Sequence, residues 1–278
     1  MGYSIFEDTM ADMTWLEVDR SAKEGAIVLF PMGVIEEHGP HMCLGVDTYL
    51  GYTKCRLMKQ KLEEKNIKTI IAPPFYWGIN NVTGDFPRSF TSRRETVKAV
   101  IYDIMASLKI LGFTYVFGVN HHGDTEHCIA LMEGIKEARM GTGIRAYYII
   151  PGTRLKFFGL KGSEPYIIIS GKPSIQTEQP RYIDIHAGEG ETAEMNRYFP
   201  ELVDTELAKT LEPTNLNIDT LKIWSRGWSE AKKLTPEGYV ENPANFENSE
   251  GNFEDYAQRM SDLIEAFLNG TYRLPETV

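Results

Sequence analysis

The sequence predicts an α/β fold: a single three-layer α/β/α domain over residues 1–278, with a mainly parallel β-sheet as its middle layer. Short apolar runs of strand length recur along the chain, and segments with helical periodicity lie between them. The runs are apolar at every position instead of at alternate positions, which is typical of strands covered on both faces. Together these observations indicate βαβ units around a parallel sheet.

Four apolar runs are the expected strands: 26–30 (AIVLF), 69–72 (TIIA), 115–119 (YVFGV) and 146–150 (AYYII). Most of their residues are β-branched, aromatic or leucine, which suits a pleated and buried position. Parallel neighbours need a crossover connection, so helices are expected between these runs.

Four segments have the spacing of amphipathic helices. The first begins near Asp47 or Thr48 and ends near Lys65, with three inward-facing leucines, Leu50, Leu57 and Leu62. The second ends at Gly112 and carries an apolar stripe on Val97, Ile101, Ile104, Leu108 and Leu111. A third should open after Asp124 or Thr125 and end near Gly141. A terminal helix shares one apolar face among Phe253, Tyr256, Met260, Leu263 and Phe267.

Two segments show no such periodicity. Residues 152–182 are rich in Gly, Pro, Ser and Lys, and they are too long for an ordinary connection, so we expect an active-site flap there. Its aromatic side chains are Phe157, Phe158 and Tyr166. Residues 210–250 are rich in Asn, Pro and Gly and are expected to form an irregular segment on the substrate side.

Composition narrows the class of protein. Hydrophobic residues make up 42% of the 278 residues, enough for a sizeable core, and the formal net charge of -10 argues against nucleic acid and anionic membranes as partners. No apolar run approaches the ~18 residues of a membrane-spanning helix, and the N-terminal segment has neither the basic nor the apolar part of a secretion signal. Three widely spaced cysteines fit no disulfide framework. We therefore expect a cytoplasmic protein that acts on a small molecule.

Histidines and carboxylates cluster in three short segments, which hold all six histidines of the chain. In the first, Glu36 and His38 follow a predicted strand at i, i+2 spacing, so their side chains can converge while Glu37 points away. Asp47 lies nine residues after His38, at a predicted helix start, where it could bridge two cations. Carboxylate and imidazole together suit zinc, manganese or iron.

The second cluster follows the strand 115–119, at the end where open α/β sheets form ligand crevices. His122 and Asp124 again have i, i+2 spacing. The third cluster supplies His186 and Glu191, which suit proton transfer beside metal ions.

Three strings resemble the signature segments of the creatininase (creatinine amidohydrolase) family, in the same order: PMGVIEEHGPHMCLGVD, VNHHGD and DIHAGEGETAEM. The resemblance implies two divalent ions per subunit, Zn or Mn with Fe as a further option, and a homo-oligomer that is often a hexamer. It implies that Glu36, Asp47 and His122 hold one ion. It implies that His38, Asp47 and Asp124 hold the other. His186 matches the family's proton-transfer position, while Glu191 matches a nearby carboxylate that is either a ligand or an orienting group.

The reaction implied is hydrolysis at a carbonyl carbon of a small, polar, cyclic substrate by a hydroxide generated on the metal ions. An amide C–N bond, as in creatinine, is the first expectation. Three alternatives stay open: hydrolysis of a C–C bond in an inositol-derived cyclic diketone, removal of a formyl group from a pyrimidine nucleotide intermediate, and a relative that binds metal without catalysis.

Overall fold

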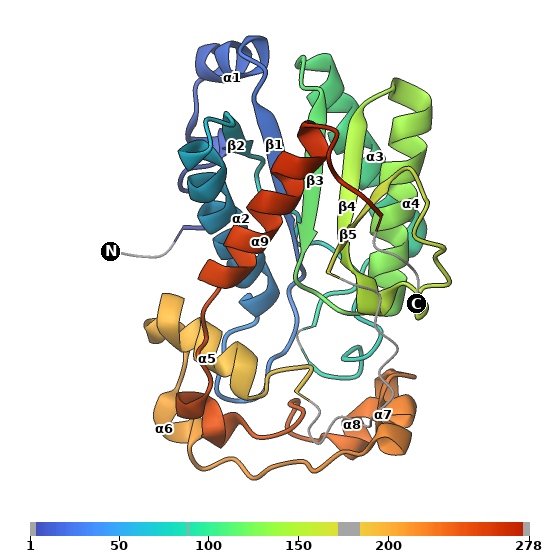
Figure 1. Cartoon of the computed structure of the whole chain (residues 1–278). Coiled ribbons are helices and arrows are strands. Elements are labelled where there is room, and N and C mark those ends of the chain that lie inside the picture. Colours follow the sequence, from blue (N-terminus) through green and yellow to red (C-terminus); the bar gives the residue numbers. More distant parts are fainter. Residues whose placement is uncertain (1–3, 88, 172–183, 275–278) are drawn as a thin grey trace.

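A parallel five-stranded β-sheet forms the middle of the molecule in a computed structural model that describes residues 4–87, 89–171 and 184–274 (Figure 1). The strands are β1 (Ile27–Met32), β2 (Thr69–Ile71), β3 (Tyr115–Asn120), β4 (Arg145–Pro151) and β5 (Ile167–Ser170), in the order β2-β1-β3-β4-β5. Every pairing between neighbours is parallel. The predicted α/β fold with a mainly parallel sheet is therefore confirmed.

Helices cover both faces of the sheet, as Figure 1 shows: α2 (Val46–Glu64) and α9 (Glu254–Leu268) on one side, α3 (Arg94–Ile110) and α4 (Thr125–Thr142) on the other. Successive residues of β1 feed two different cores because side chains alternate along a strand. Val28 and Phe30 pack with α3 and α4. Ile27 and Leu29 pack with α2 and α9. This double burial is why the strands are apolar at every position.

The remaining helices are short, and several gather beyond the carboxyl end of the sheet (Figure 1). They are η1 (Met10–Asp12), α1 (Trp15–Lys23), η2 (Gly152–Arg154), α5 (Glu189–Tyr198), η3 (Pro200–Leu202), α6 (Thr205–Ala208), α7 (Ile218–Trp224), α8 (Trp228–Leu234) and η4 (Pro243–Asn248). The segment 210–250, expected to be irregular, thus contains α7 and α8 around a small core of Trp224, Ala231 and Val240, and η4, whose Phe246 packs with Ala193 and Ala208.

Part of the predicted flap, residues 152–182, is an edge strand of the sheet. Ile167, Ile168 and Ile169 are buried and pair with β4, because three successive isoleucines favour a strand covered on both faces. The flap prediction therefore does not hold for β5. Residues 172–182 of the predicted flap lie outside the described residues. Among the residues described, none of the helices has the length and apolar character needed to cross a lipid bilayer.

Candidate metal centre

Two loops that begin side by side at the carboxyl edge of the sheet carry most of the clustered polar side chains. β1 ends at Met32 and β3 ends at Asn120, and these two residues are paired in the sheet register. The His121 N–H continues the contact by donating to the Met32 carbonyl at 3.1 Å. Open parallel sheets form ligand crevices at this edge. The loops that carry Glu36 and His122 therefore start at the same place.

Helix α2 brings Asp47 to the same edge. A Cβ atom on Gly33 would lie 2.8 Å from the Asp47 carbonyl carbon, so glycine is the residue that lets the start of α2 come this close to the end of β1. Thr48 strengthens the contact by donating from its hydroxyl to the Val34 carbonyl at 3.0 Å. Asp47 is 2% exposed as a result.

One group of potential metal ligands joins Glu36, Asp47 and His122, all buried, with ligand atoms within 4.8 Å of one another. His122 Nδ1 lies 3.1 Å from Glu36 Oε2 and 3.3 Å from Asp47 Oδ2. The other oxygen of Glu36 accepts a hydrogen bond from the Thr83 hydroxyl at 2.6 Å, which fixes the rotation of the carboxylate. The three residues predicted for one ion are thus brought together.

A second group joins His38, Asp47 and Glu191. His38 Nε2 lies 3.8 Å from Asp47 Oδ2 and 3.7 Å from Glu191 Oε2. Asp47 belongs to both groups, as expected for a carboxylate that bridges two ions. Glu191 comes from the first turn of α5, where its Oε2 also accepts the Ala187 N–H at 2.6 Å.

Three imidazoles are held from outside the cluster by oxygen acceptors. His122 Nε2 lies 3.0 Å from the Ile79 carbonyl, and His38 Nδ1 lies 3.1 Å from the Glu36 carbonyl. A carbonyl oxygen only accepts, so these outer nitrogens carry a proton, and in the neutral rings that bind a metal ion the lone pairs lie on His122 Nδ1 and His38 Nε2. His186 follows the same pattern: its Nε2 faces Glu37 Oε1 at 3.3 Å, and its Nδ1 faces Glu36 Oε2 at 3.9 Å.

Buried atoms in the cluster lack the hydrogen bonds that burial demands. Within the described ranges, no hydrogen bond reaches Glu36 Oε2, His38 Nε2 or Asp47 Oδ2. Leaving such atoms unpaired is costly in a folded protein. Divalent cations would satisfy all three, and the mixed oxygen and nitrogen donors suit zinc or manganese. The residues present therefore fit a pair of divalent ions.

The charges of these groups depend on one another. Burial opposes ionisation of Glu36 and Asp47, but the surrounding imidazoles, His122 foremost, hold the pKa of both carboxyls below the usual range. Burial also opposes a charge on His186, yet Glu36, Glu37 and Glu191 outweigh it and raise its pKa to about 10. Concentrated negative charge thus stabilises protons on imidazoles in the metal-free cluster, and cations would compete for the same lone pairs.

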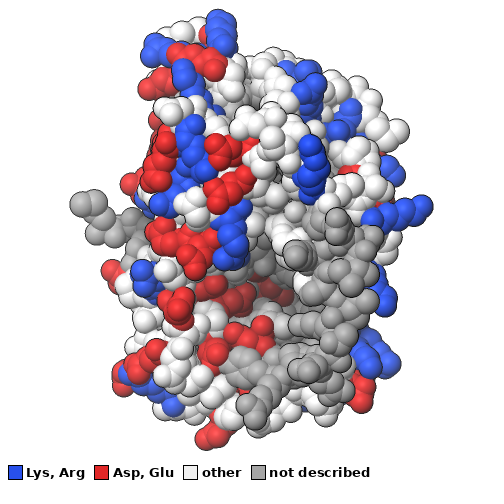
Figure 2. Space-filling model, viewed as in Figure 1, with Lys and Arg blue, Asp and Glu red and all other residues white. Residues whose placement is uncertain are grey.

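A cavity of about 310 Å³ opens onto this cluster. Its lining includes Glu36, His122, His186, Phe157, Trp224 and Arg154. The rings of His186 and Trp224 have centroids 6.1 Å apart. Figure 2 shows acidic side chains gathered in a hollow of the surface, between the part that holds the sheet and the part that holds α5 to α8. The cavity can accept a small molecule beside the candidate ligands.

Comparison with known proteins agrees with the geometry of the site. The family model Creatininase, creatinine amidohydrolase, matches residues 11–266. The chain belongs to the creatininase family. A creatinine amidohydrolase of Pseudomonas putida is 25% identical over 217 residues, which is 74% of this chain and 76% of that protein.

Solved creatininase structures share the fold. A crystal structure of creatinine amidohydrolase has a TM-score of 0.66 at 19% identity, and the match covers 97% of this chain and 99% of that one. A creatininase with Mn has a TM-score of 0.63 at 18% identity and covers 94% of this chain and 98% of that one. A variant creatininase of Zn–Zn type, also at 0.63 and 18%, covers 96% and 99%. Family membership supports a hydrolase, and the structures with Mn and Zn together with the buried ligand groups support a divalent metal.

Asp124 occupies a different place in this creatininase-family chain from the one expected. Its Oδ1 caps α4 by accepting the N–H groups of Glu126 at 2.9 Å and His127 at 3.2 Å. Its Oδ2 accepts the N–H groups of Asn81 at 2.9 Å and Val82 at 3.2 Å. Four backbone donors use both oxygens, and Asp124 belongs to none of the ligand groups among the described residues. The structure gives its expected place beside His38 and Asp47 to Glu191.

Several residues near the cluster had no sequence signal of their own. Glu37 was expected to point away from the cluster, but its carboxylate meets His186, whose ring also faces Glu36 and His38. Trp224 lines the cavity from α7, outside the predicted flap. Of the three aromatic residues expected in the flap, Phe157 lines the cavity while Phe158 and Tyr166 pack against the main core. Long-range contacts of this kind have no local pattern in the sequence.

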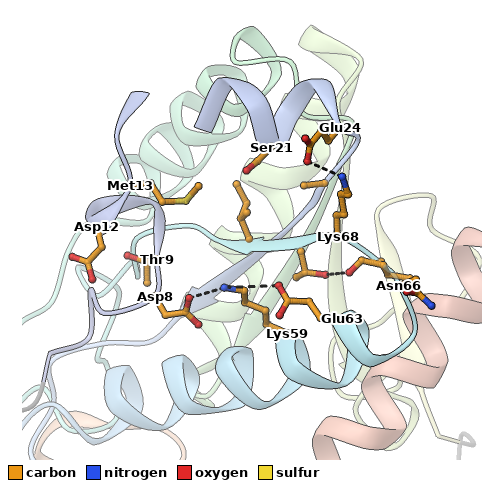
Figure 3. A pocket seen from close by; sticks show the side chains of 14 residues that line it. Asp8, Thr9, Asp12, Met13, Ser21, Glu24, Lys59, Glu63, Asn66 and Lys68 are labelled. Atoms are coloured by element: carbon orange, nitrogen blue, oxygen red, sulfur yellow. Dashed lines mark hydrogen bonds and ion pairs between the residues drawn. The ribbon is translucent and has the colours of Figure 1, made fainter. Parts of the chain in front are cut away.

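A larger cavity, of about 660 Å³, lies beside α1, α2 and β2, away from the candidate ligands (Figure 3). Both lysines of its lining pair with carboxylates. Lys59 lies 2.6 Å from Asp8, and Lys68 lies 2.7 Å from Glu24 (Figure 3). The strands begin at this end of the sheet, whereas the candidate ligands lie at the end where β1 and β3 terminate. Size alone therefore does not identify the functional site.

Proposed function

We propose that this chain is a metal-dependent hydrolase that acts at a carbonyl carbon of a small, polar, cyclic substrate, with an amide C–N bond as the first candidate. One observation carries the proposal. Three imidazoles are held by oxygen acceptors on their outer nitrogens and turn their inner nitrogens toward buried carboxylates. Outer hydrogen bonds of this kind orient histidine ligands in metal sites.

Glu36, Asp47 and His122 would hold one divalent ion, and His38, Asp47 and Glu191 would hold the other. Two of the three ligand groups among the described residues share Asp47 and support this assignment; the third joins Glu36, His38 and His186. Zinc and manganese fit the donors best, with iron as a further option. When bound, such ions supply an activated water and polarise the substrate carbonyl. Asp124 has the role of capping α4 in this assignment.

His186 and Glu37 would handle the proton. Glu37 Oε1 accepts from His186 Nε2, so in the neutral ring the lone pair lies on Nδ1, which faces Glu36 and the candidate ligands. From there Nδ1 can take a proton from the attacking water and later return it to the leaving atom. Glu37 stabilises the imidazolium in between. Its own carboxylate is fixed by the Gly39 N–H at 3.0 Å.

The substrate would lie in the 310 Å³ cavity between the ligands, Phe157 and Trp224. Arg154 is the single lysine or arginine in its described lining. Arg94, at the start of α3, is not in that lining and pairs with Glu126 at 3.1 Å and Glu133 at 2.6 Å. A phosphorylated nucleotide is therefore a weaker candidate than an uncharged ring.

Hydrolysis of a C–C bond in an inositol-derived cyclic diketone is the second candidate. The observation that favours it is the polar part of the cavity wall, where Thr125, Ser225 and Arg154 offer hydrogen bonds to a polyhydroxylated ring. An amide such as creatinine has fewer groups to use them. Both reactions need the same activated water, so the substrate decides between them.

Metal analysis of the purified protein, followed by a screen of cyclic amides, lactones and cyclic diketones, tests the proposal. We expect close to two divalent ions per chain and turnover that a chelator abolishes. Asp47→Ala should lose metal and activity together while the chain stays folded. A protein that binds no divalent ion, before or after addition of Mn or Zn, would refute the proposal. Two bound ions without turnover of any of these compounds would favour a non-catalytic relative.

A homo-oligomer, often a hexamer in the resemblance described above, and a cytoplasmic location complete the proposal. Light scattering on the purified protein would give the mass in solution. A monomer at micromolar concentration would contradict the oligomer.

A further inference from the structure

Lys54 is a cation placed next to the candidate metal centre, and no carboxylate of the described residues forms an ion pair with it. It lies on α2, two turns after Asp47, and its Nζ sits 4.6 Å from the ring centroid of Phe253 and 5.0 Å from that of Tyr256. In the described part of the chain it makes one hydrogen bond, to His121 Nδ1 at 2.7 Å. The aromatic rings hold the ammonium group in place, and its single acceptor fixes the direction in which it donates a hydrogen bond.

The hydrogen bond from Lys54 in turn fixes which nitrogen of His121 donates to Glu191. An ammonium group only donates, so His121 Nδ1 accepts and His121 Nε2 carries the ring proton. Nε2 then donates to Glu191 Oε1 at 3.2 Å. The ring itself is fixed by its edge contact with Phe253, with centroids 6.1 Å apart, and by its backbone hydrogen bond to Met32. Lys54 therefore determines which group donates and which accepts in both hydrogen bonds, from Lys54 to His121 and from His121 to Glu191.

Glu191 is the residue that this arrangement positions. His121 occupies Oε1, and the Ala187 N–H directs Oε2, which faces His38 Nε2 at 3.7 Å. Without Lys54, His121 could carry its proton on Nδ1 and turn a bare Nε2 lone pair toward the carboxylate. Two lone pairs facing each other repel, so Glu191 would rotate away from His38 and Asp47.

We propose that Lys54 and His121 are positioning residues that fix Glu191 for the second divalent ion, the one held by His38, Asp47 and Glu191. The inference rests on the two-ion assignment of the proposed function, and it adds two residues that belong to none of the ligand groups among the described residues. Removal of a residue that orients a ligand typically weakens metal binding about 10- to 100-fold. The effect should fall on one ion only, because His122 is oriented independently by Ile79.

Calorimetric titration of the metal-free protein with Zn²⁺ in the presence of a competing chelator measures both ions without a substrate. We expect Lys54→Met to lose about 10- to 100-fold in affinity for one of the two ions. His121→Phe should lose a similar amount. The double variant should be no worse than either single variant, because both act through one contact to Glu191. His121→Gln should recover much of the loss, since its amide can accept from Lys54 and donate to Glu191 at once.

Lys59→Met is the matched control. Lys59 lies on the same helix but pairs with Asp8 beside the distant cavity (Figure 3), so both affinities should stay at the wild-type values. Unchanged zinc affinities in Lys54→Met would overturn the inference, as would losses that add in the double variant. A wild-type protein that binds one ion and turns over substrate would also overturn it and leave a one-ion hydrolase standing. A wild-type protein that binds no ion would overturn the proposed function as well.

Nitrogen chemical shifts of ¹⁵N-histidine in the zinc-loaded wild-type protein give a second measurement, which does not depend on whether a variant folds. The expected result is a neutral His121 ring with its proton on Nε2. A proton on Nδ1 would overturn the inference, because Lys54 could not then donate to that atom.

Discussion

Glu37→Gln replaces one carboxylate oxygen by an NH₂ group at the outer edge of the site and should nevertheless remove most of the activity. Glu37 accepts two N–H groups, from Gly39 at 3.0 Å and from His186 Nε2 at 3.3 Å. A glutamine offers one acceptor and one donor, so it cannot replace both contacts. Glu37 is 7% exposed, and water is poorly placed to repair the mismatch.

Either orientation of the glutamine has a defined cost. If its oxygen faces His186, its NH₂ group opposes the Gly39 N–H, a buried unsatisfied contact that costs about 1–3 kcal/mol. If its oxygen faces Gly39, its NH₂ group donates to His186 Nε2 and drives the ring proton to Nδ1. The Gly39 N–H belongs to the backbone and cannot move away, so we expect the second orientation. Nδ1 then has no lone pair to accept a proton from water.

Loss of the proton acceptor should lower kcat by about 10²- to 10⁴-fold, the usual contribution of general acid–base catalysis. At about 1.36 kcal/mol per factor of ten, this corresponds to about 3–5 kcal/mol in the activation free energy. The assay is kcat on the substrate identified by the screen, with metal content measured on the same samples. Ser89→Ala is the control, because the Ser89 hydroxyl contacts the Glu37 backbone N–H and leaves the carboxylate untouched. A Glu37→Gln enzyme with wild-type kcat and full metal content would refute this reasoning.

Three further predictions address the ligands, the pH dependence and the effect of metal. Glu191→Ala should lose one of two bound ions. Asp124→Ala should keep both ions and lose about 1–3 kcal/mol of stability, because it leaves four backbone N–H groups without their acceptor. Metal content and urea unfolding of both variants separate these outcomes, and the reverse pattern would contradict the assignment. His41 is 2% exposed, and burial above all lowers its pKa to about 4 from 6.5, so its contribution to stability is complete above pH 6.5 and is lost as the pH falls to 4. The loss amounts to about 3 kcal/mol, and His41→Gln should flatten it in chelator-treated protein; equal slopes from pH 7 to pH 4 would count against this origin. Zinc at about 1,000 times its dissociation constant should raise the free energy of unfolding by about 4 kcal/mol. A urea unfolding midpoint that is the same with and without zinc would argue that the cluster does not bind zinc.

Local patterns in the sequence were sufficient to predict those helices and strands whose structure depends mainly on their own residues. The stripe on Val97, Ile101 and Leu108 predicted the buried face of α3, and the uninterrupted apolar run at β1 predicted burial on both faces of the sheet. The four main helices were found for the same reason. β5 was missed because three isoleucines in a Gly- and Pro-rich stretch give a weaker signal than the surrounding composition, and only pairing with β4 makes them a strand. The short helices α5 to α8 are likewise set by packing of distant segments.

The rule that residues i and i+2 share a side explains both the success at Glu36 and the different outcome at Asp124. Glu36 and His38 lie in a segment without regular structure and meet at the cluster. Asp124 lies at the junction with α4, where its φ of -58° and ψ of 133° turn the carboxylate over the first N–H groups of the helix. An aspartate just before a helix is a preferred N-cap, so the sequence did contain the competing signal.

Glu37 shows what such a rule leaves out. The alternation treats Glu37 as turned away from Glu36 and His38, but a loop about 150 residues later brings the ring of His186 against its carboxylate, and the same ring faces Glu36. The site therefore has two surfaces. On the inner surface, the ligand nitrogens of His38 and His122 converge with the carboxylates. On the outer surface, oxygen acceptors determine which nitrogen of each neutral ring can bind a metal ion. The inner surface can be guessed from residue types and spacing. The outer one depends on carbonyl groups of Glu36 and Ile79, which every residue has and which only the folded chain can assign.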